Sequence, residues 1–171
     1  MNAPLPVLVT RHAATRAGKT IARLGGPEAA RLAERLATET QGQVLFDAAA
    51  RGRYATDASF YQVMPIGVFV PRTQDDVATA IDIARDLGAP VLMRGAGTSQ
   101  CGQTTGAALV VDASKHLRNV LAFDRDAMTA EVEPGIVLDA LNAQLKAHRL
   151  WFPVDVSTSA QATIGGMAAN N

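Results

Sequence analysis

The chain has 171 residues, with 16 basic and 16 acidic side chains, so its net charge is zero when histidine is neutral. This length suits one domain or two small ones, and it is enough to bury a hydrophobic core. Nucleic-acid-binding domains carry a basic excess or patch, so the equal numbers of basic and acidic side chains argue against that class of protein.

The distribution of apolar residues and the single cysteine indicate where in the cell the protein is expected. No run of about 18 apolar residues is present, so we predict no transmembrane segment, and residues 1–10 lack the features of a signal peptide. Cys101 alone excludes an internal disulfide and fits a reducing compartment. We expect a cytoplasmic protein, and the alternative is a protein peripherally associated with the inner membrane. His116 and His148 have no second ligand at suitable spacing, so we predict no metal site.

The first third of the chain is predicted to be an irregular arm, a helix and a short strand. The arm covers residues 1–26. Pro27 suits a first helical position, and apolar residues at helical spacing extend the helix to residue 40. Residues 43–46 form a short strand, and residues 51–59 form a polar loop or a short helix.

A strand, a helix and a second strand follow within 27 residues. The first strand covers residues 67–70, and Thr73 is a good N-cap for a helix with one apolar stripe. Gly88 ends this helix, and residues 91–93 form the second strand. The order predicts a βαβ unit with parallel strands.

The pattern changes after the next, glycine-rich segment. Strands are predicted over residues 107–111, 120–123 and 128–133, and a helix over 137–149. Residues 128–133 alternate apolar and polar side chains, which indicates a half-exposed antiparallel strand. The predicted fold class is therefore α+β, with a βαβ subdomain followed by a smaller antiparallel α+β subdomain.

The glycine-rich segment, residues 94–106, is the strongest candidate for a binding site. It carries four glycines and four hydroxyl side chains directly after a strand. Glycines allow a sharp turn close to a ligand, and free backbone N–H groups in such a turn favour phosphate. Gln100 replaces the third glycine of the dinucleotide fingerprint, and Gln103 replaces the Walker A lysine. The segment is either a phosphate loop of another kind or a glycine-rich hairpin that binds nothing.

The final stretch, residues 151–171, is the second informative region. It is rich in serine, threonine and small residues, and Gly165 and Gly166 allow close backbone approach. It lacks the charge of a disordered segment. We expect the chain to stop before its fold is complete.

Three separated motifs resemble the FAD-binding domain of the vanillyl-alcohol oxidase/PCMH-type flavoprotein superfamily. They are Val70–Thr73 with the helix that follows, Arg94–Thr98, and Asp155 with Thr163–Asn170. Within the superfamily, the chain is most similar to the FAD-linked D-2-hydroxyacid dehydrogenases, such as glycolate oxidase large subunit, D-lactate dehydrogenase and D-2-hydroxyglutarate dehydrogenase. The resemblance covers residues 43–171 as the truncated first part of a PCMH-type domain. Residues 1–42 are then an N-terminal arm and helix.

The resemblance implies two sets of cofactor-binding residues. The set that holds the FAD pyrophosphate is Arg94, Gly95, Ala96, Gly97, Thr98, Ser99, Gly102, Gln103 and Thr104. The set that lines the other side of the flavin is Pro153, Asp155, Ser157, Thr163, Gly165, Gly166 and Asn170. Some family members attach FAD covalently through a histidine where this chain has Thr98, so we expect non-covalent FAD.

The resemblance also implies the reaction and its partners. We expect a flavin-dependent oxidoreductase that oxidises a small D-2-hydroxy acid to the 2-oxo acid and passes electrons to an acceptor that the sequence does not identify. An iron–sulfur cluster is expected only in a region beyond this chain. The family's catalytic residues also lie further on, so none is assigned, and this chain alone is expected to be inactive. The alternatives are a sugar or alcohol oxidase of the same fold and a non-catalytic nucleotide-binding module.

Overall fold

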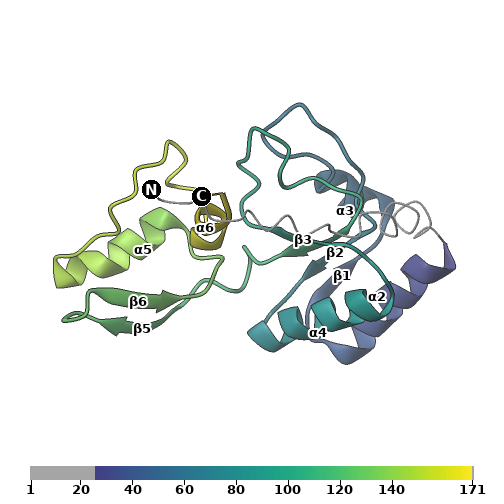
Figure 1. Cartoon of the computed structure of the whole chain (residues 1–171), viewed down its shortest axis with the longest axis horizontal. Coiled ribbons are helices and arrows are strands. Elements are labelled where there is room, and N and C mark those ends of the chain that lie inside the picture. Colours follow the sequence, from purple (N-terminus) through teal and green to yellow (C-terminus); the bar gives the residue numbers. More distant parts are fainter. Residues whose placement is uncertain (1–25, 171) are drawn as a thin grey trace, which may run out of the picture.

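A computed structural model describes residues 26–170, so nearly all of the predicted N-terminal arm lies outside the described residues. The described part forms two units (Figure 1). The larger unit is built on a four-stranded sheet, and the smaller unit on a two-stranded sheet. This arrangement confirms the predicted α+β class. Within residues 26–170, no helix has both the length and the hydropathy needed to cross a membrane.

The larger sheet has the strand order β1–β2–β4–β3. Its strands are β1 (Gln43–Leu45), β2 (Gly67–Val70), β3 (Val91–Arg94) and β4 (Leu109–Asp112). β1 is antiparallel to β2, and β4 is parallel to both β2 and β3. The strand predicted over 107–111 therefore belongs to the larger unit. All four residues of β4 are buried, as expected for a strand that has neighbours on both sides and is covered on both faces.

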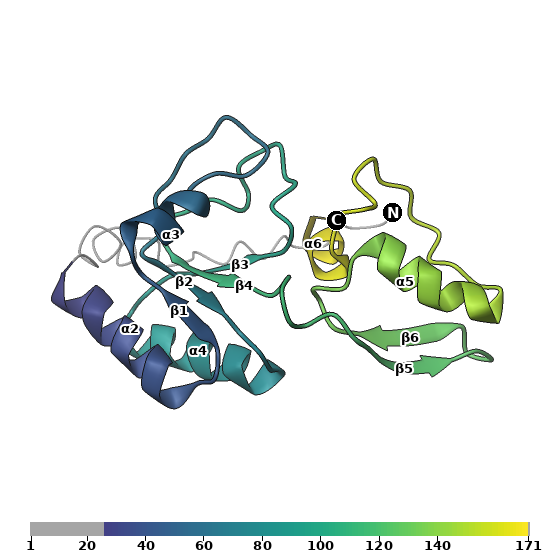
Figure 2. The ribbon, with the colours of Figure 1, turned by 180° about the vertical axis from the view of Figure 1, so that it is seen from behind.

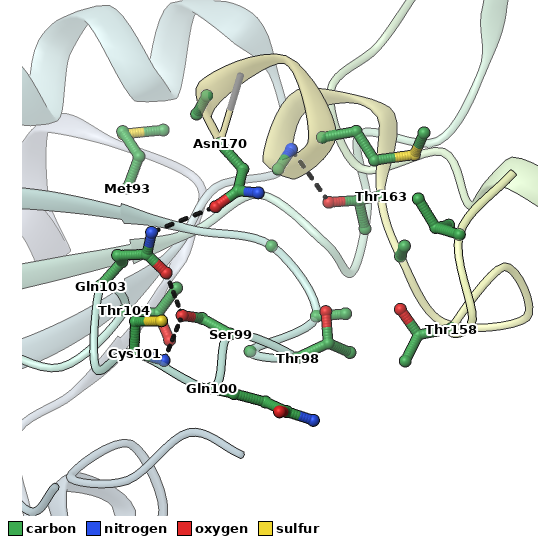
Figure 3. Close-up of a pocket in the computed structure, with 18 of the residues that line it drawn as sticks. Met93, Thr98, Ser99, Gln100, Cys101, Gln103, Thr104, Thr158, Thr163 and Asn170 are labelled. Atoms are coloured by element: carbon green, nitrogen blue, oxygen red, sulfur yellow. Dashed lines mark hydrogen bonds between the residues drawn. The ribbon is translucent and has the colours of Figure 1, made fainter. Parts of the chain in front are cut away.

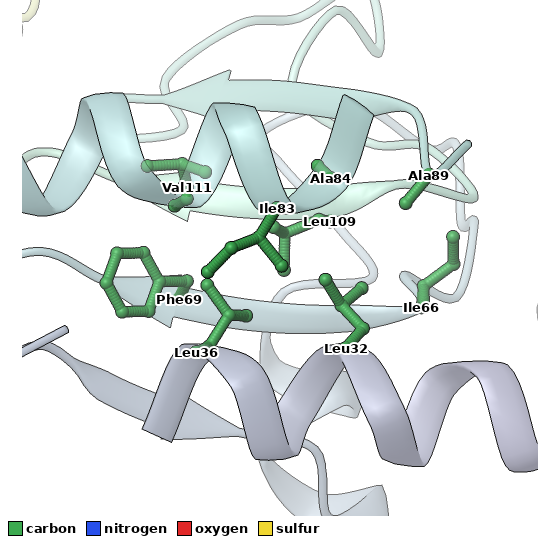
Figure 4. Close-up of a cluster of buried hydrophobic side chains, with 10 residues drawn as sticks. Leu32, Leu36, Ile66, Phe69, Ile83, Ala84, Ala89, Leu109 and Val111 are labelled. Atoms are coloured by element: carbon green, nitrogen blue, oxygen red, sulfur yellow. The ribbon is translucent and has the colours of Figure 1, made fainter. Parts of the chain in front are cut away.

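Two helices cover one face of this sheet, α2 (Pro27–Glu39) and α4 (Gln74–Asp86) (Figure 2). Both confirm the predicted helices. Leu32 and Leu36, one turn apart on α2, are fully buried against Ile83 of α4. Phe69 and Val111 of the sheet complete this core (Figure 4).

The opposite face of the sheet is covered by α3 (Ala48–Arg53) and the segment that follows it. Tyr54, directly after α3, packs on the buried side chains of Val68, Val70 and Val110. The residues of β2 and β4 thus alternate between the two cores, as the pleat of a strand requires.

The smaller unit combines a β-hairpin with helices. Its elements are β5 (Val120–Asp124), β6 (Thr129–Val132), α5 (Leu138–Leu145), the 3₁₀ turn η2 (Lys146–His148) and α6 (Ile164–Asn170). β5 and β6 pair antiparallel, which confirms the predicted hairpin, and Ile136, Leu141 and Leu145 form the core under them. α6 has no counterpart among the helices predicted from the sequence.

A buried carboxylate fixes the start of α4. Thr73 Oγ1 accepts a hydrogen bond from Asp76 N–H at 3.1 Å, which makes Thr73 the predicted N-cap. Asp76, only 5% exposed, accepts hydrogen bonds from the backbone N–H groups of Gln41 (2.9 Å), Arg72 (2.8 Å) and Thr73 (3.3 Å). This side chain therefore joins the α2–β1 connection to the first turn of α4.

Asp76→Ala is expected to lower the free energy of unfolding by about 2–3 kcal/mol, because three partly buried N–H groups lose their charged acceptor. Urea unfolding measures the loss. The matched control is Asp75→Ala in the same helical turn, where the exposed carboxylate interacts only with the helix dipole and its loss costs under about 1 kcal/mol. Equal losses in the two variants would contradict the role of Asp76.

Candidate functional site

A pocket of about 560 Å³ is formed by two segments far apart in the sequence (Figure 3). One wall is the glycine-rich segment, and the other runs from residue 156 to residue 170 in the smaller unit. Leu92 and Met93 of β3 complete the lining. The two informative regions of the sequence therefore meet at one site.

Most of the predicted cofactor-binding residues line this pocket. They are Gly95, Ala96, Gly97, Thr98, Ser99, Gln103, Thr104, Thr163, Gly166 and Asn170. The predicted residues outside the lining are Arg94, Gly102, Pro153, Asp155, Ser157 and Gly165. Pro153, Asp155 and Ser157 are exposed, and Gly165 lies against Pro134, where an added Cβ would come within 2.6 Å.

Several lining residues were not predicted. They are Leu92, Met93, Gln100, Cys101, Val156, Thr158, Ala162, Met167 and Ala169. On α6, Gly166, Ala169 and Asn170 are spaced three and four residues apart and line the pocket together. A helical interpretation of residues 164–170 would have indicated this shared face.

The backbone of the glycine-rich segment turns at two left-handed glycines. Gly97 has a φ of 72° and Gly102 a φ of 76°. None of the backbone N–H groups from Ala96 to Gln100 donates to an acceptor within residues 26–170. Free N–H groups in a turn of this kind bind anions. The segment therefore has the donors of a phosphate loop.

The pocket lining contains no charged side chain among the described residues. An anion bound here would be stabilised by backbone N–H groups and by the hydroxyl of Thr98. These fixed dipoles are in place before a ligand arrives, so little reorganisation accompanies binding. Arg94, which is predicted to hold the pyrophosphate, lies outside this lining.

The guanidinium of Arg94 lies against the glycine-rich segment outside the pocket. Its Nη1 donates to the carbonyl oxygens of Thr104 at 3.1 Å and Tyr54 at 3.4 Å. Its Nη2 would lie 2.5 Å from a Cβ added at Gly97. In this position Arg94 supports the turn, because its guanidinium lies beside Gly97 near the start of the segment and bonds to Thr104 near its end.

Residues 57–61 hold the glycine-rich segment from outside the pocket. Ala58 N–H donates to the Gly97 carbonyl at 3.1 Å, and Thr104 Oγ1 donates to Asp57 Oδ2 at 3.2 Å. The ring of Tyr61 covers Gly102, where an added Cβ would come within 2.7 Å of it. The left-handed turns at both glycines are therefore fixed by neighbouring residues.

The carboxylate of Asp57 keeps its charge in this network. Burial alone would raise the pKa of Asp57, but hydrogen bonds from Ser59 and Thr104 outweigh burial and hold the pKa below its ordinary value of 3.8. A carboxylate with a lowered pKa stabilises the folded state above the unfolded pKa. Its contribution is present at neutral pH and is lost as the pH falls through the lowered value.

The second wall is fixed to the smaller unit and contacts the first wall at two places. Thr163, only 2% exposed, accepts a hydrogen bond from Gly166 N–H at 3.3 Å, and its hydroxyl occupies the space that a Cβ at Gly95 would need. Gln103 Nε2 donates to Asn170 Oδ1 at 3.1 Å across the pocket (Figure 3). Gln103 also bonds to Ser99 within the first wall.

The chain is similar to several characterised proteins. A family model described as the FAD binding domain matches residues 65–171. The D-2-hydroxyglutarate dehydrogenase of Pseudomonas putida is 40% identical over 133 residues, which are 74% of this chain and 13% of that protein. The glycolate oxidase subunit GlcD of Bacillus subtilis is 35% identical over 139 residues, which are 78% of this chain and 29% of that protein.

Among solved structures, alkyldihydroxyacetonephosphate synthase superposes with a TM-score of 0.73 at 22% sequence identity. The match covers 85% of this chain and 29% of that chain, and at this identity it concerns the fold alone. This chain therefore spans less than a third of each of these three proteins.

Proposed function

The chain belongs to the FAD binding domain family, and from this membership we propose that it is the FAD-binding portion of an oxidoreductase that oxidises a D-2-hydroxy acid to the 2-oxo acid. Its cofactor is FAD. The substrate class is supported by the relatives, whose names specify D-2-hydroxyglutarate and glycolate. A cytoplasmic location is part of the proposal and fits the single, exposed Cys101.

The observation that carries the proposal is the two-walled pocket. The N–H groups from Ala96 to Gln100, which have no acceptor within residues 26–170, and the hydroxyl of Thr98 fit a pyrophosphate, which needs donors from a backbone that comes close. The hydroxyl of Thr163 and the amide of Asn170 suit the polar ribityl chain. The residues present therefore fit FAD, and we propose that these two walls hold it.

When bound, FAD supplies the hydride acceptor for oxidation of the substrate carbon that bears the hydroxyl. The role of the described residues is to bind FAD and to orient it. Among residues 26–170, Cys101 is the only titratable side chain in the lining, so we assign no general base to the pocket. Because Thr98 stands where some family members have the histidine that binds FAD covalently, we propose that FAD is held without a covalent bond.

We further propose the extent of the domain. Residues 43–171 form its first part, and residues 1–42 precede it as an arm and a helix. The helix α2, which belongs to this preceding segment, contributes Leu32 and Leu36 to the core of the larger unit and packs against its sheet. Any iron–sulfur cluster belongs to a region beyond these residues.

Visible spectroscopy of the natural gene product, purified from its own host, tests the proposal. A flavin spectrum with flavin released by acid is expected, and anaerobic addition of D-2-hydroxyglutarate, D-lactate or glycolate should bleach it. L-Lactate is the matched control and should not. A folded, colourless protein would favour the non-catalytic module, and bleaching by sugars or alcohols alone would favour the alternative oxidase.

Asp57→Ala is expected to weaken FAD binding about threefold to tenfold. The substitution removes the carboxylate that accepts the hydrogen bond from Thr104 Oγ1, so the glycine-rich segment is held less firmly in its binding conformation. Fluorescence titration of the apoprotein measures the dissociation constant. The control is Asp126→Ala, which removes an exposed carboxylate from the distant β5–β6 turn. Unchanged affinity in Asp57→Ala would show that the segment keeps its conformation without this support.

A further inference from the structure

A second cavity, of about 300 Å³, shares only Gly95 and Ala96 with the first. Its other lining residues are Arg53, Tyr54, Arg94, Asp112, Ser114 and Lys115. Arg94 ends β3 and Asp112 ends β4, so the cavity opens at the carboxyl ends of two parallel strands. Ligands of open α/β sheets bind at this edge.

The floor of this cavity is a saturated polar network. Asp112, 3% exposed, accepts the Tyr54 hydroxyl at 2.6 Å on Oδ2, and accepts Ser114 N–H at 2.9 Å and Ser114 O–H at 2.6 Å on Oδ1. Burial, together with the hydrogen bond to Asp112, raises the pKa of Tyr54 well above its ordinary value, so the phenol stays protonated and adds no negative charge. Three donors already share the single carboxylate.

Three cationic side chains surround this floor. Arg94 Cζ lies 5.2 Å and Lys115 Nζ 5.9 Å from the centroid of the Tyr54 ring, both within the range of cation–π attraction. Arg94 already donates hydrogen bonds to the carbonyl oxygens of Tyr54 and Thr104. Arg53 and Lys115 form no ion pair or side-chain hydrogen bond within residues 26–170.

We propose that this cavity is a second anion site, in which Arg53 and Lys115 bind a small dianion such as a phosphate or a dicarboxylate. These two cations, which form no ion pair within the described part of the chain, come from separate segments and match the charge of a dianion. A guanidinium fork suits the paired oxygens of carboxylates and phosphates equally. The volume leaves space for a group attached to the anion. This function goes beyond FAD binding, which uses the other cavity.

Isothermal titration of the purified protein with inorganic phosphate, and separately with succinate, tests the site. One equivalent is expected to bind the wild type, and Arg53→Ala/Lys115→Ala should weaken binding at least tenfold. Both side chains are exposed, so the double variant keeps its fold, which circular dichroism checks. Arg125→Ala/Lys146→Ala removes the same charge from exposed positions elsewhere and should leave binding unchanged.

Two further measurements separate this site from the FAD pocket. Asn170→Ala, which changes the second wall of the FAD pocket and lies outside the second cavity, should retain phosphate or succinate binding, and excess FAD should not displace the anion. Binding of only one probe still supports the site and identifies its ligand as phosphorylated or dicarboxylic. The inference is overturned if neither probe binds, if Arg53→Ala/Lys115→Ala binds normally, or if Asn170→Ala abolishes anion binding. Flavin content is measured on the same samples, so failure of FAD binding is recognised independently.

Discussion

Gly97→Val is expected to leave the purified protein with less than about a tenth of the wild-type flavin. A residue with a side chain loses roughly 1–2 kcal/mol in the left-handed region that Gly97 occupies at a φ of 72°, and a β-branched residue loses more. Each 1.4 kcal/mol is a tenfold change in affinity. The added Cβ would also lie 2.5 Å from Arg94 Nη2. Arg94 can retreat only by giving up its bonds to Thr104 and Tyr54.

The measurement is flavin absorbance per protein after purification, with the dissociation constant of the apoprotein for added FAD. The matched control is Gly52→Val, since Gly52 has no atom within 4 Å of an added Cβ and no left-handed backbone. Valine is also the better helix former in α3. Undiminished flavin in Gly97→Val would remove the glycine-rich segment from the cofactor site.

Phe69→Ala is expected to lower the free energy of unfolding by about 3–5 kcal/mol, which is the cost of removing a buried aromatic ring and leaving a cavity. Phe69 lies on β2, is fully buried and belongs to the core between the sheet and the helices α2 and α4 (Figure 4). A loss of this size is a large fraction of the stability of a domain.

Urea unfolding, followed by circular dichroism, gives this free energy. Phe60→Ala is the matched control, because the same substitution is made at a side chain that is 87% exposed, and it should cost under about 1 kcal/mol. A small loss in Phe69→Ala, or equal losses in both variants, would mean that the sheet is packed differently.

Elements with local signals could be predicted from the sequence. Thr73 and Asp76 form the capping box that begins α4, and Gly88, at a φ of 65°, follows its end. The position of β4 could not be predicted in this way, because a buried apolar run is equally suited to any central position in a sheet. α6 has two glycines and no apolar stripe, and backbone bonds from Ile164 and Gly165 to Ile136 and Pro134 hold it. Such tertiary bonds leave no local pattern.

The candidate site could be predicted from the sequence to a similar extent. The spacing of glycines and hydroxyls marked the first wall, and the family resemblance marked residues of the second. The contacts of Asp57 and Ala58 with the glycine-rich segment join residues 47 and 39 positions apart, so no local sequence pattern predicts them. Arg94 was expected to face a phosphate because charge can be read from a sequence, whereas the direction of a long side chain depends on the carbonyl oxygens around it.

The two walls of the pocket belong to units with separate hydrophobic cores, which has a thermodynamic consequence. A ligand that touches both walls binds only when the units are docked, so it links their unfolding equilibria. At a ligand concentration of one hundred times Kd, this linkage adds about 2.7 kcal/mol to the native state. Calorimetry of the apoprotein is therefore expected to resolve two overlapping transitions, which merge into one cooperative transition as FAD is added.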